Sequence, residues 1–260
     1  MEHAETLRLA AFLAILAAMA AWEFAAPDRR AEIPRLIRWT NNLALVALDT
    51  ALVRLLIPLL PLAAADMAAA RDWGLLAPLP LWAAIPLAFL LLDLLIWGQH
   101  RLMHAHPLLW RFHRMHHADT EVDASTGLRF HPLEILLSTL IKIAAILALG
   151  APALAVIAFE IVLNATSLFS HANIRLAPAT DRALRRLFVT PAMHRIHHSI
   201  RREETDSNFG FNLTLWDRLF GTYRAAPQDD PATMPLGIAE FRSRREAWLD
   251  RLLTQPFRTR

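Results

Sequence analysis

Long apolar stretches alternate with short polar segments along this chain. Four stretches stand out: Leu7–Ala26, Asn42–Ala65, Pro78–Trp97 and Leu133–Phe169. About 20 apolar helical residues cross the hydrocarbon core of a bilayer. The last stretch is too long for one span and breaks at Gly150-Ala151-Pro152, which predicts a hairpin of two short helices, spanning or re-entrant. We therefore expect an all-α integral membrane protein with about four transmembrane or re-entrant helices.

Composition supports helices and restricts the chemistry. The chain is 55% hydrophobic, with a mean hydropathy of +0.30, and it has only seven glycines. Cysteine is absent, which excludes disulfides and thiolate metal ligands. Leu7–Ala26 could also be read as a signal peptide, but the run is long for that and Pro27 follows it directly. We interpret it as a membrane anchor.

The arginines predict an orientation. Pro27–Thr40 holds four arginines, whereas Asp66–Ala77 holds only Arg71, and Gly98–Pro132 again holds four. Because basic loops stay on the cytoplasmic side, we expect the first and last of these segments there, in an inner or plasma membrane. The same pattern fits anionic headgroups rather than nucleic acid. We divide the chain into N-terminal membrane helices (1–97), a core (98–224) that includes the hairpin near 133–169, and a polar tail (225–260).

Histidines carry the candidate chemistry. The chain reads HRMHH at 113–117 and HRIHH at 194–198, and two further histidines at 100 and 104 continue an apolar helix. Spacings of three and four residues place side chains on one helix face. The sequence therefore predicts a helical, cytosolic metal-binding cap whose ligands are eight histidines: His100, His104, His113, His116, His117, His194, His197 and His198.

Eight nitrogen ligands are too many for one ion, so we expect two ions. Imidazole suits iron, zinc, copper and nickel, and ligand type alone leaves the metal open. The chain contains no Glu-x-x-His, the motif of the soluble di-iron bundles, and no His-Glu-x-x-His of zinc peptidases. A di-iron centre here would be held mainly by histidine.

The ordered boxes HRLMH, HRMHH and HRIHH resemble those of the integral-membrane fatty acid hydroxylase and sterol desaturase superfamily. The likeness extends to Arg129–Glu134, Phe169–Ile174, Asn208–Phe211 and Trp216–Tyr223. It covers residues 93–223, whereas the first ninety residues agree only in being apolar.

The resemblance implies a non-haem di-iron centre that uses O2 and two external electrons to hydroxylate a C–H bond of a lipid. Desaturation by the same centre is an alternative, and a histidine-rich divalent-metal transporter is a rival from another class. Ligands of a transporter are expected near mid-membrane, whereas these histidines follow the ends of the apolar stretches. Without a fused electron-transfer segment in the sequence, we expect a separate donor, cytochrome b5-like, a ferredoxin or a reductase.

Other polar residues have weaker assignments. His171 follows the hairpin and is our candidate for a ninth ligand, with His131 next. Asp93 lies two turns before His100 and could hydrogen-bond a ligand histidine, and Asn208 is a candidate to line the site or to form a turn. Lys142 and Glu160 lie equally far from the hairpin turn and are expected to pair.

Overall fold

The computed structural model describes residues 2–258, and in this part of the chain every regular element is a helix. Only two isolated β-bridges occur there. The helices are α1 (Glu2–Ala25), α2 (Arg35–Leu56), α3 (Pro61–Ala70), α4 (Leu81–Ala105), α5 (Pro107–His117), η1 (Ala124–Leu128), α6 (Pro132–Leu149), α7 (Ala153–His171), α8 (Pro178–Leu184), α9 (Pro191–His197), α10 (Arg202–Thr205), α11 (Leu215–Leu219), η2 (Arg244–Ala247), α12 (Leu249–Thr254) and η3 (Gln255–Phe257).

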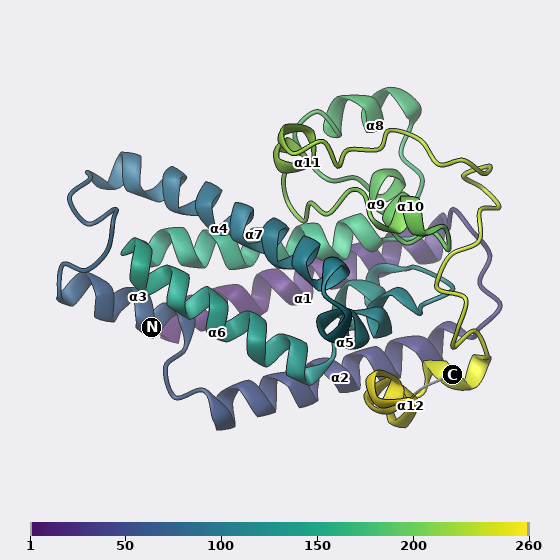
Figure 1. Ribbon diagram of the computed structural model, residues 1–260, viewed down its shortest axis with the longest axis horizontal. Coiled ribbons are helices and arrows are strands. Elements are labelled where there is room, and N and C mark those ends of the chain that lie inside the picture. Colours follow the sequence, from purple (N-terminus) through teal and green to yellow (C-terminus); the bar gives the residue numbers. More distant parts are fainter. Residues whose placement is uncertain (1, 259–260) are drawn as a thin grey trace.

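Five helical segments of the described chain are long and apolar enough to cross a membrane: Ala4–Ala25, Arg35–Ala70, Leu81–Ala105, Pro132–Leu149 and Ala153–His171. The predicted all-α membrane fold is confirmed, with five candidate spans where about four were expected. Figure 1 shows these helices lying lengthwise together, with the short helices α8–α11 gathered at one end.

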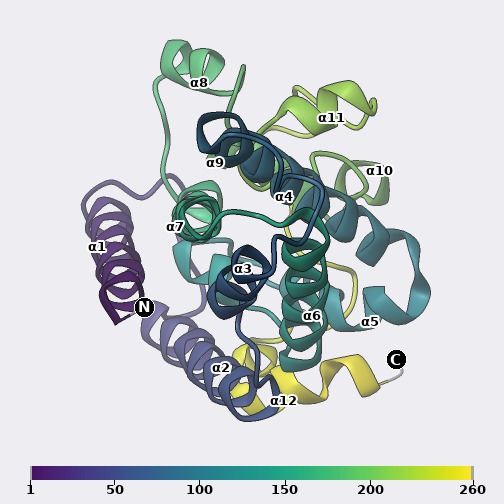
Figure 2. The same ribbon diagram turned by 90° about the vertical axis from the view of Figure 1, so that its left-hand side faces the viewer.

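The apolar stretch Asn42–Ala65 is not one continuous helix. It is divided between α2 and α3 by a break at Ile57–Leu60. Pro58 and Pro61 explain the break, because proline lacks the amide hydrogen that a helix interior requires. After the break, α3 packs against α6 and α7, as the end view in Figure 2 shows.

The main core lies between α3, α4, α6 and α7. Small buried residues such as Ala64, Ala88 and Ala155 let these helices approach closely around Leu92 and Phe159. The outer surface of the spans is also apolar. In Ala4–Ala25 only 6% of the most apolar part of the helix is buried inside the protein. An apolar surface of this extent on helices of this length is typical of helices that contact lipid.

The predicted hairpin is formed by α6 and α7. Gly150 ends α6 in the left-handed region, with φ at 63°, and Pro152 precedes the first turn of α7. A side chain at Gly74 would lie 2.0 Å from the backbone nitrogen of Gly150, so the loop before α4 packs directly on this turn. The predicted pair is present, since Lys142 Nζ donates to Glu160 Oε1 at 3.0 Å.

The part of the chain that contains the short helices α8–α11, called the cap here, is fixed to α4 by two tryptophans. Trp216 Nε1 of α11 donates to Asp93 Oδ2 at 2.8 Å, and Trp97 Nε1 of α4 donates to Asp217 Oδ1 at 3.0 Å. Asp217 also accepts from the backbone amides of Phe209 and Gly210. These bonds hold the chain segment after α9 against the membrane helices.

Candidate metal centre

Four helices deliver histidines to one region of the molecule. His100 and His104 lie in the last turns of α4, and His171 is the last residue of α7. The two five-residue histidine motifs, His113–His117 and His194–His198, are called pentads here. They lie in α5 and at the end of α9, and each of these helices has proline in its first turn, at Pro107 and Pro191. Proline is favoured there because its missing amide hydrogen has no partner within the helix.

These histidines form two groups. Within each group, one nitrogen per ring lies within 4.8 Å of every other, and every residue is buried. The five-histidine group comprises His100, His104, His113, His117 and His197, and the four-histidine group comprises His116, His171, His194 and His198. All eight box histidines are therefore brought together, and His171 joins them.

Each pentad contributes to both groups. His113 and His117 belong to the five-histidine group, whereas His116 between them belongs to the four-histidine group. In the second pentad, His197 belongs to the first group and His194 and His198 to the second. A single helix turn thus serves two neighbouring sites, which gives a physical reason for the repeated pentad.

Several ring orientations are fixed by hydrogen bonds at Nδ1. His100, His171 and His197 contact the carbonyl oxygens of Phe209, Ser167 and Ser207 at 2.8, 2.7 and 2.7 Å. A carbonyl only accepts, so each Nδ1 is the protonated nitrogen and Nε2 carries the lone pair. Acceptors of this kind orient metal-binding histidines and set their tautomer.

Carboxylates orient two further rings. Glu134 Oε1 lies 2.7 Å from His113 Nδ1, and Asp206 Oδ1 lies 3.2 Å from His104 Nδ1. Neither Glu134 nor Asp206 was predicted from the sequence to orient a histidine ring. The available signal for Glu134 was an acidic residue in the first turn of an otherwise apolar helix.

The arrangement of ring nitrogens fits cations. His100 Nε2 and His197 Nε2 lie 3.0 Å apart, and because both rings donate through Nδ1, two lone pairs face each other. That contact is repulsive unless a cation lies between them. His198 supports the same conclusion, since neither of its buried ring nitrogens has a hydrogen-bond partner among the described residues.

Burial keeps five of the histidines outside the spans neutral. It lowers the pKa of His197 to about 3, and it lowers the pKa of His116, His117, His194 and His198 well below the usual value, with repulsion from neighbouring histidines as the next cause. Neutral imidazole is the form that binds metal ions. At physiological pH these five histidines are therefore in the protonation state that can bind a metal ion.

Three sequence-predicted residues lie elsewhere. His131 is outside both groups: its Nδ1 accepts from the Leu133 amide, and its Nε2 contacts the Leu253 carbonyl, each at 3.2 Å. Asp93 bonds Trp216 of the cap rather than a described histidine. Asn208 supports a loop, since its amide donates to the carbonyls of Met193 and Arg224 and its φ is 53°.

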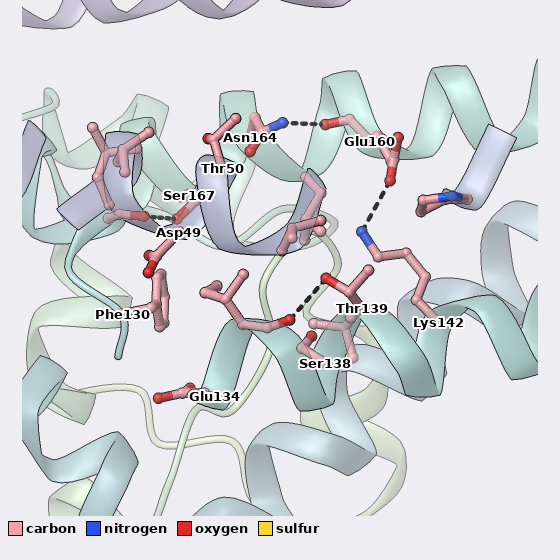
Figure 3. A pocket seen from close by; sticks show the side chains of 18 of the residues that line it. Asp49, Thr50, Phe130, Glu134, Ser138, Thr139, Lys142, Glu160, Asn164 and Ser167 are labelled. Atoms are coloured by element: carbon pink, nitrogen blue, oxygen red, sulfur yellow. Dashed lines mark hydrogen bonds and ion pairs between the residues drawn. The ribbon is translucent and has the colours of Figure 1, made fainter. Parts of the chain in front are cut away.

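A cavity of about 510 Å³ reaches the five-histidine group from between the membrane helices. His100 and His113 line one part of it, with apolar walls that include Ile96, Leu163 and Phe211. Figure 3 shows Asp49, Phe130 and Glu134 near this part, and Lys142 with Glu160 farther along. The site thus combines buried metal ligands with a pocket of ligand-binding size.

The fold and the site together define a helical membrane protein with two buried histidine groups that could hold metal ions. Residues 85–222 match the sequence profile of the fatty acid hydroxylase family. Because this match covers more than half of the chain, the protein belongs to that family. No solved structure matches the chain significantly.

Characterised relatives share the same region. The chain is 31% identical to the ornithine lipid hydroxylase OlsE of Rhizobium tropici over 159 residues, 61% of this chain and 46% of that protein. It is 33% identical to the alkylglycerol monooxygenase of Homo sapiens, covering 53% of this chain and 30% of that protein. Cholesterol 25-hydroxylase of Rattus norvegicus is 29% identical, covering 54% of this chain and 47% of that protein. The chain thus spans less than half the length of each.

Proposed function

We propose that this protein is a membrane-bound non-haem di-iron monooxygenase that hydroxylates a C–H bond of a lipid. The observation that carries the proposal is the pair of buried histidine groups, the first of which borders a cavity between the membrane helices. The names of the relatives support it, since each describes a hydroxylase or a monooxygenase.

Iron fits this proposal better than zinc, because zinc has no redox chemistry. The five- and four-histidine groups would each hold one ion. Bound iron would supply the reduction of O2: with two electrons and two protons from outside, one oxygen atom enters the C–H bond and the other leaves as water. Nine neutral imidazoles bring no negative charge, and the carboxylates of Glu134 and Asp206 would offset part of the charge of the ions.

The protein's own residues would position the lipid and exclude water. Ile96, Leu163 and Phe211 form apolar walls around the chain that is to be oxidised. The ring of Phe130 stacks on His116 with centroids 4.6 Å apart and also lines the cavity. A dry, closed site protects the substrate and the oxidant from side reactions.

We propose that the histidines face the cytoplasm. Arg38, which belongs to the arginine-rich segment Pro27–Thr40 and lies near the start of α2, forms an ion pair with Asp119, two residues after His117. The basic segment therefore lies at the same end of the molecule as the metal centre, in agreement with the positive-inside rule. Electrons would arrive there from a separate donor protein, and an acidic one would complement the arginines.

The test is a lipid mass profile of cells that express the protein under 18O2, beside cells that express His116→Ala. We expect one lipid class to gain one labelled oxygen with the intact protein alone. A loss of two hydrogens without label would replace hydroxylation by desaturation. Unchanged lipids together with altered cellular metal content would favour the metal transporter.

A further inference from the structure

A charged cluster lies in the cavity away from the histidines. Glu160 of α7 accepts from Lys142 of α6 through Oε1 at 3.0 Å, and its Oε2 lies 2.7 Å from Arg8 of α1. All three residues line the cavity, and Glu160 is only 4% exposed. Two cations share one carboxylate, so the cluster keeps one positive charge that its own members do not neutralise.

The position of the cluster makes this charge costly. Lys142 and Glu160 lie near the middle of two candidate spans, where charged residues are rare and are paired. Glu5, another acidic residue of the cavity wall, lies 3.5 Å from Arg54 of α2 and forms a separate pair. One pair is enough to pack two helices, and the second cation on the same carboxylate adds a positive charge that an anionic ligand would neutralise.

The other end of the cavity carries two acidic residues. Asp49 Oδ1 and Glu134 Oε2 are buried without a hydrogen-bond partner among the described residues. Glu134 lies eight residues before Lys142 on α6, about 12 Å away along the helix axis. Figure 3 shows the two ends, with Asp49 and Glu134 well apart from the Lys142–Glu160 pair. The positive charge of Arg8 and Lys142 is thus well separated along the cavity from these two carboxyl groups and from the histidines.

We propose that Arg8 and Lys142 form an anion-binding subsite that holds the acidic end group, carboxylate or phosphate, of a single-chain lipid. The hydrocarbon chain then runs along the cavity toward His100 and His113. The volume of about 510 Å³ is within the range of pockets that hold one ligand molecule. This inference deepens the proposed function and rests on it for the fate of the chain, which would be oxidised at a position remote from its end group.

The experiment measures binding without turnover. Dissociation constants of hexadecanoate, hexadecyl phosphate and hexadecanol are determined for the full-length, metal-loaded protein in detergent, with no reductant. Lys142→Gln is expected to weaken binding of the two acids about tenfold, the effect of a lost charge-assisted hydrogen bond, and to leave hexadecanol within about twofold. Whichever acid binds the unaltered protein more tightly identifies the end group.

Two further variants separate binding from structure. Lys142→Arg keeps the charge and is expected to keep acid binding. Glu160→Gln frees both cations and is expected to tighten acid binding, which a purely structural cluster would not do. Arg54→Gln is the matched control, since Arg54 lines the same cavity but pairs with Glu5 and is expected to leave the acids unaffected. Equal metal content in all variants shows that the centre is intact.

The subsite is overturned if Lys142→Gln weakens hexadecanol as much as the acids, or weakens neither, or if Glu160→Gln does not tighten acid binding. Its failure is distinct from failure of the proposed function. Acid binding without oxidation of any lipid would refute the monooxygenase and keep the subsite. Lipid oxidation with acid binding unchanged in Lys142→Gln would do the reverse.

Discussion

The two ends of the cavity place polar groups in apolar surroundings by different means. At the metal end, nine histidines converge, and the lone pairs of His100 and His197 face each other. At the other end, Arg8 and Lys142 are charged and share the single carboxylate of Glu160. Each arrangement is unfavourable alone, and each is relieved by a different partner: cations at the first and an anion at the second.

This difference shows why a buried polar group must be judged with its partners. Burial disfavours the protonated form of a histidine, and the ring then becomes a better metal ligand. An arginine in such surroundings keeps its charge, and a lysine paired with a carboxylate is held in its charged form, so both require a counter-ion. The groups left without a partner thus indicate what each end of the cavity is suited to bind: facing lone pairs fit a cation, and an excess positive charge fits an anion.

The largest effect on metal content and activity is expected when a histidine of one of the two groups is replaced, compared with a histidine outside both. His194→Ala leaves three members in the four-histidine group, so we expect metal content to fall from two ions per chain toward one. We expect oxygen incorporation to fall by more than about 100-fold, since changes beyond the direct ligands already cost 10–100-fold. Elemental analysis and the 18O2 assay measure both quantities.

His131→Ala is the matched control for that experiment. His131 contacts the Leu133 amide and the Leu253 carbonyl and lies outside both groups, so we expect full metal content. The loss of this cap at the start of α6 should cost about 1 kcal/mol of stability. Loss of an ion in His131→Ala, or two ions retained in His194→Ala, would contradict the assignment of the groups.

Acid should destabilise the metal-free protein strongly. The pKa of His197 is lowered to about 3, and those of His116, His117, His194 and His198 are also lowered, whereas an unfolded chain titrates near 6.5. The unfolded chain therefore binds more protons between these values. Stability is complete above about pH 6.5 and is lost as the pH falls toward 3, by about 1.4 kcal/mol per pH unit for each such histidine.

Thermal unfolding of chelator-treated protein between pH 8 and pH 5 measures this loss. The metal-loaded protein is the control, and it should retain its Tm to lower pH because bound ions compete with protons. A Tm that is the same at pH 8 and pH 5 in the metal-free protein would show that the histidines are not buried as a neutral cluster.

The charged end of the cavity predicts an asymmetry between its members. Glu160→Gln leaves Arg8 and Lys142 facing each other, and we expect a loss on the order of 3 kcal/mol of stability. Lys142→Gln leaves Glu160 paired with Arg8, and we expect a loss below about 1 kcal/mol. Chemical or thermal unfolding of both variants, with Arg54→Gln as control, measures the difference. Equal losses would indicate a simple Lys142–Glu160 pair to which Arg8 adds nothing.

The sequence predicts the metal end of the cavity better than the charged end, and the reason is physical. The eight box histidines repeat at three and four residues within helices, so local periodicity places them on common faces, and the hairpin break at Gly150 is equally local. Arg8 is 152 positions away from Glu160 in the sequence, and only tertiary packing brings them together. Asp93 shows the same limit: its place on α4 was predicted, but its partner Trp216 comes from a distant cap helix.

The smallest expected effect concerns the two carboxylates that orient ligand rings. Glu134 is 5% exposed and lies 2.7 Å from His113 Nδ1, whereas Asp206 is partly exposed, lies 3.2 Å from His104 Nδ1 and also binds Arg202. We expect Glu134→Gln to weaken metal affinity about 10–100-fold and Asp206→Asn to weaken it less, because water can replace a partly exposed acceptor. Competition with a chelator of known affinity measures both variants. An Asp206→Asn effect equal to that of Glu134→Gln would mean that burial of the acceptor does not govern how firmly these rings are held.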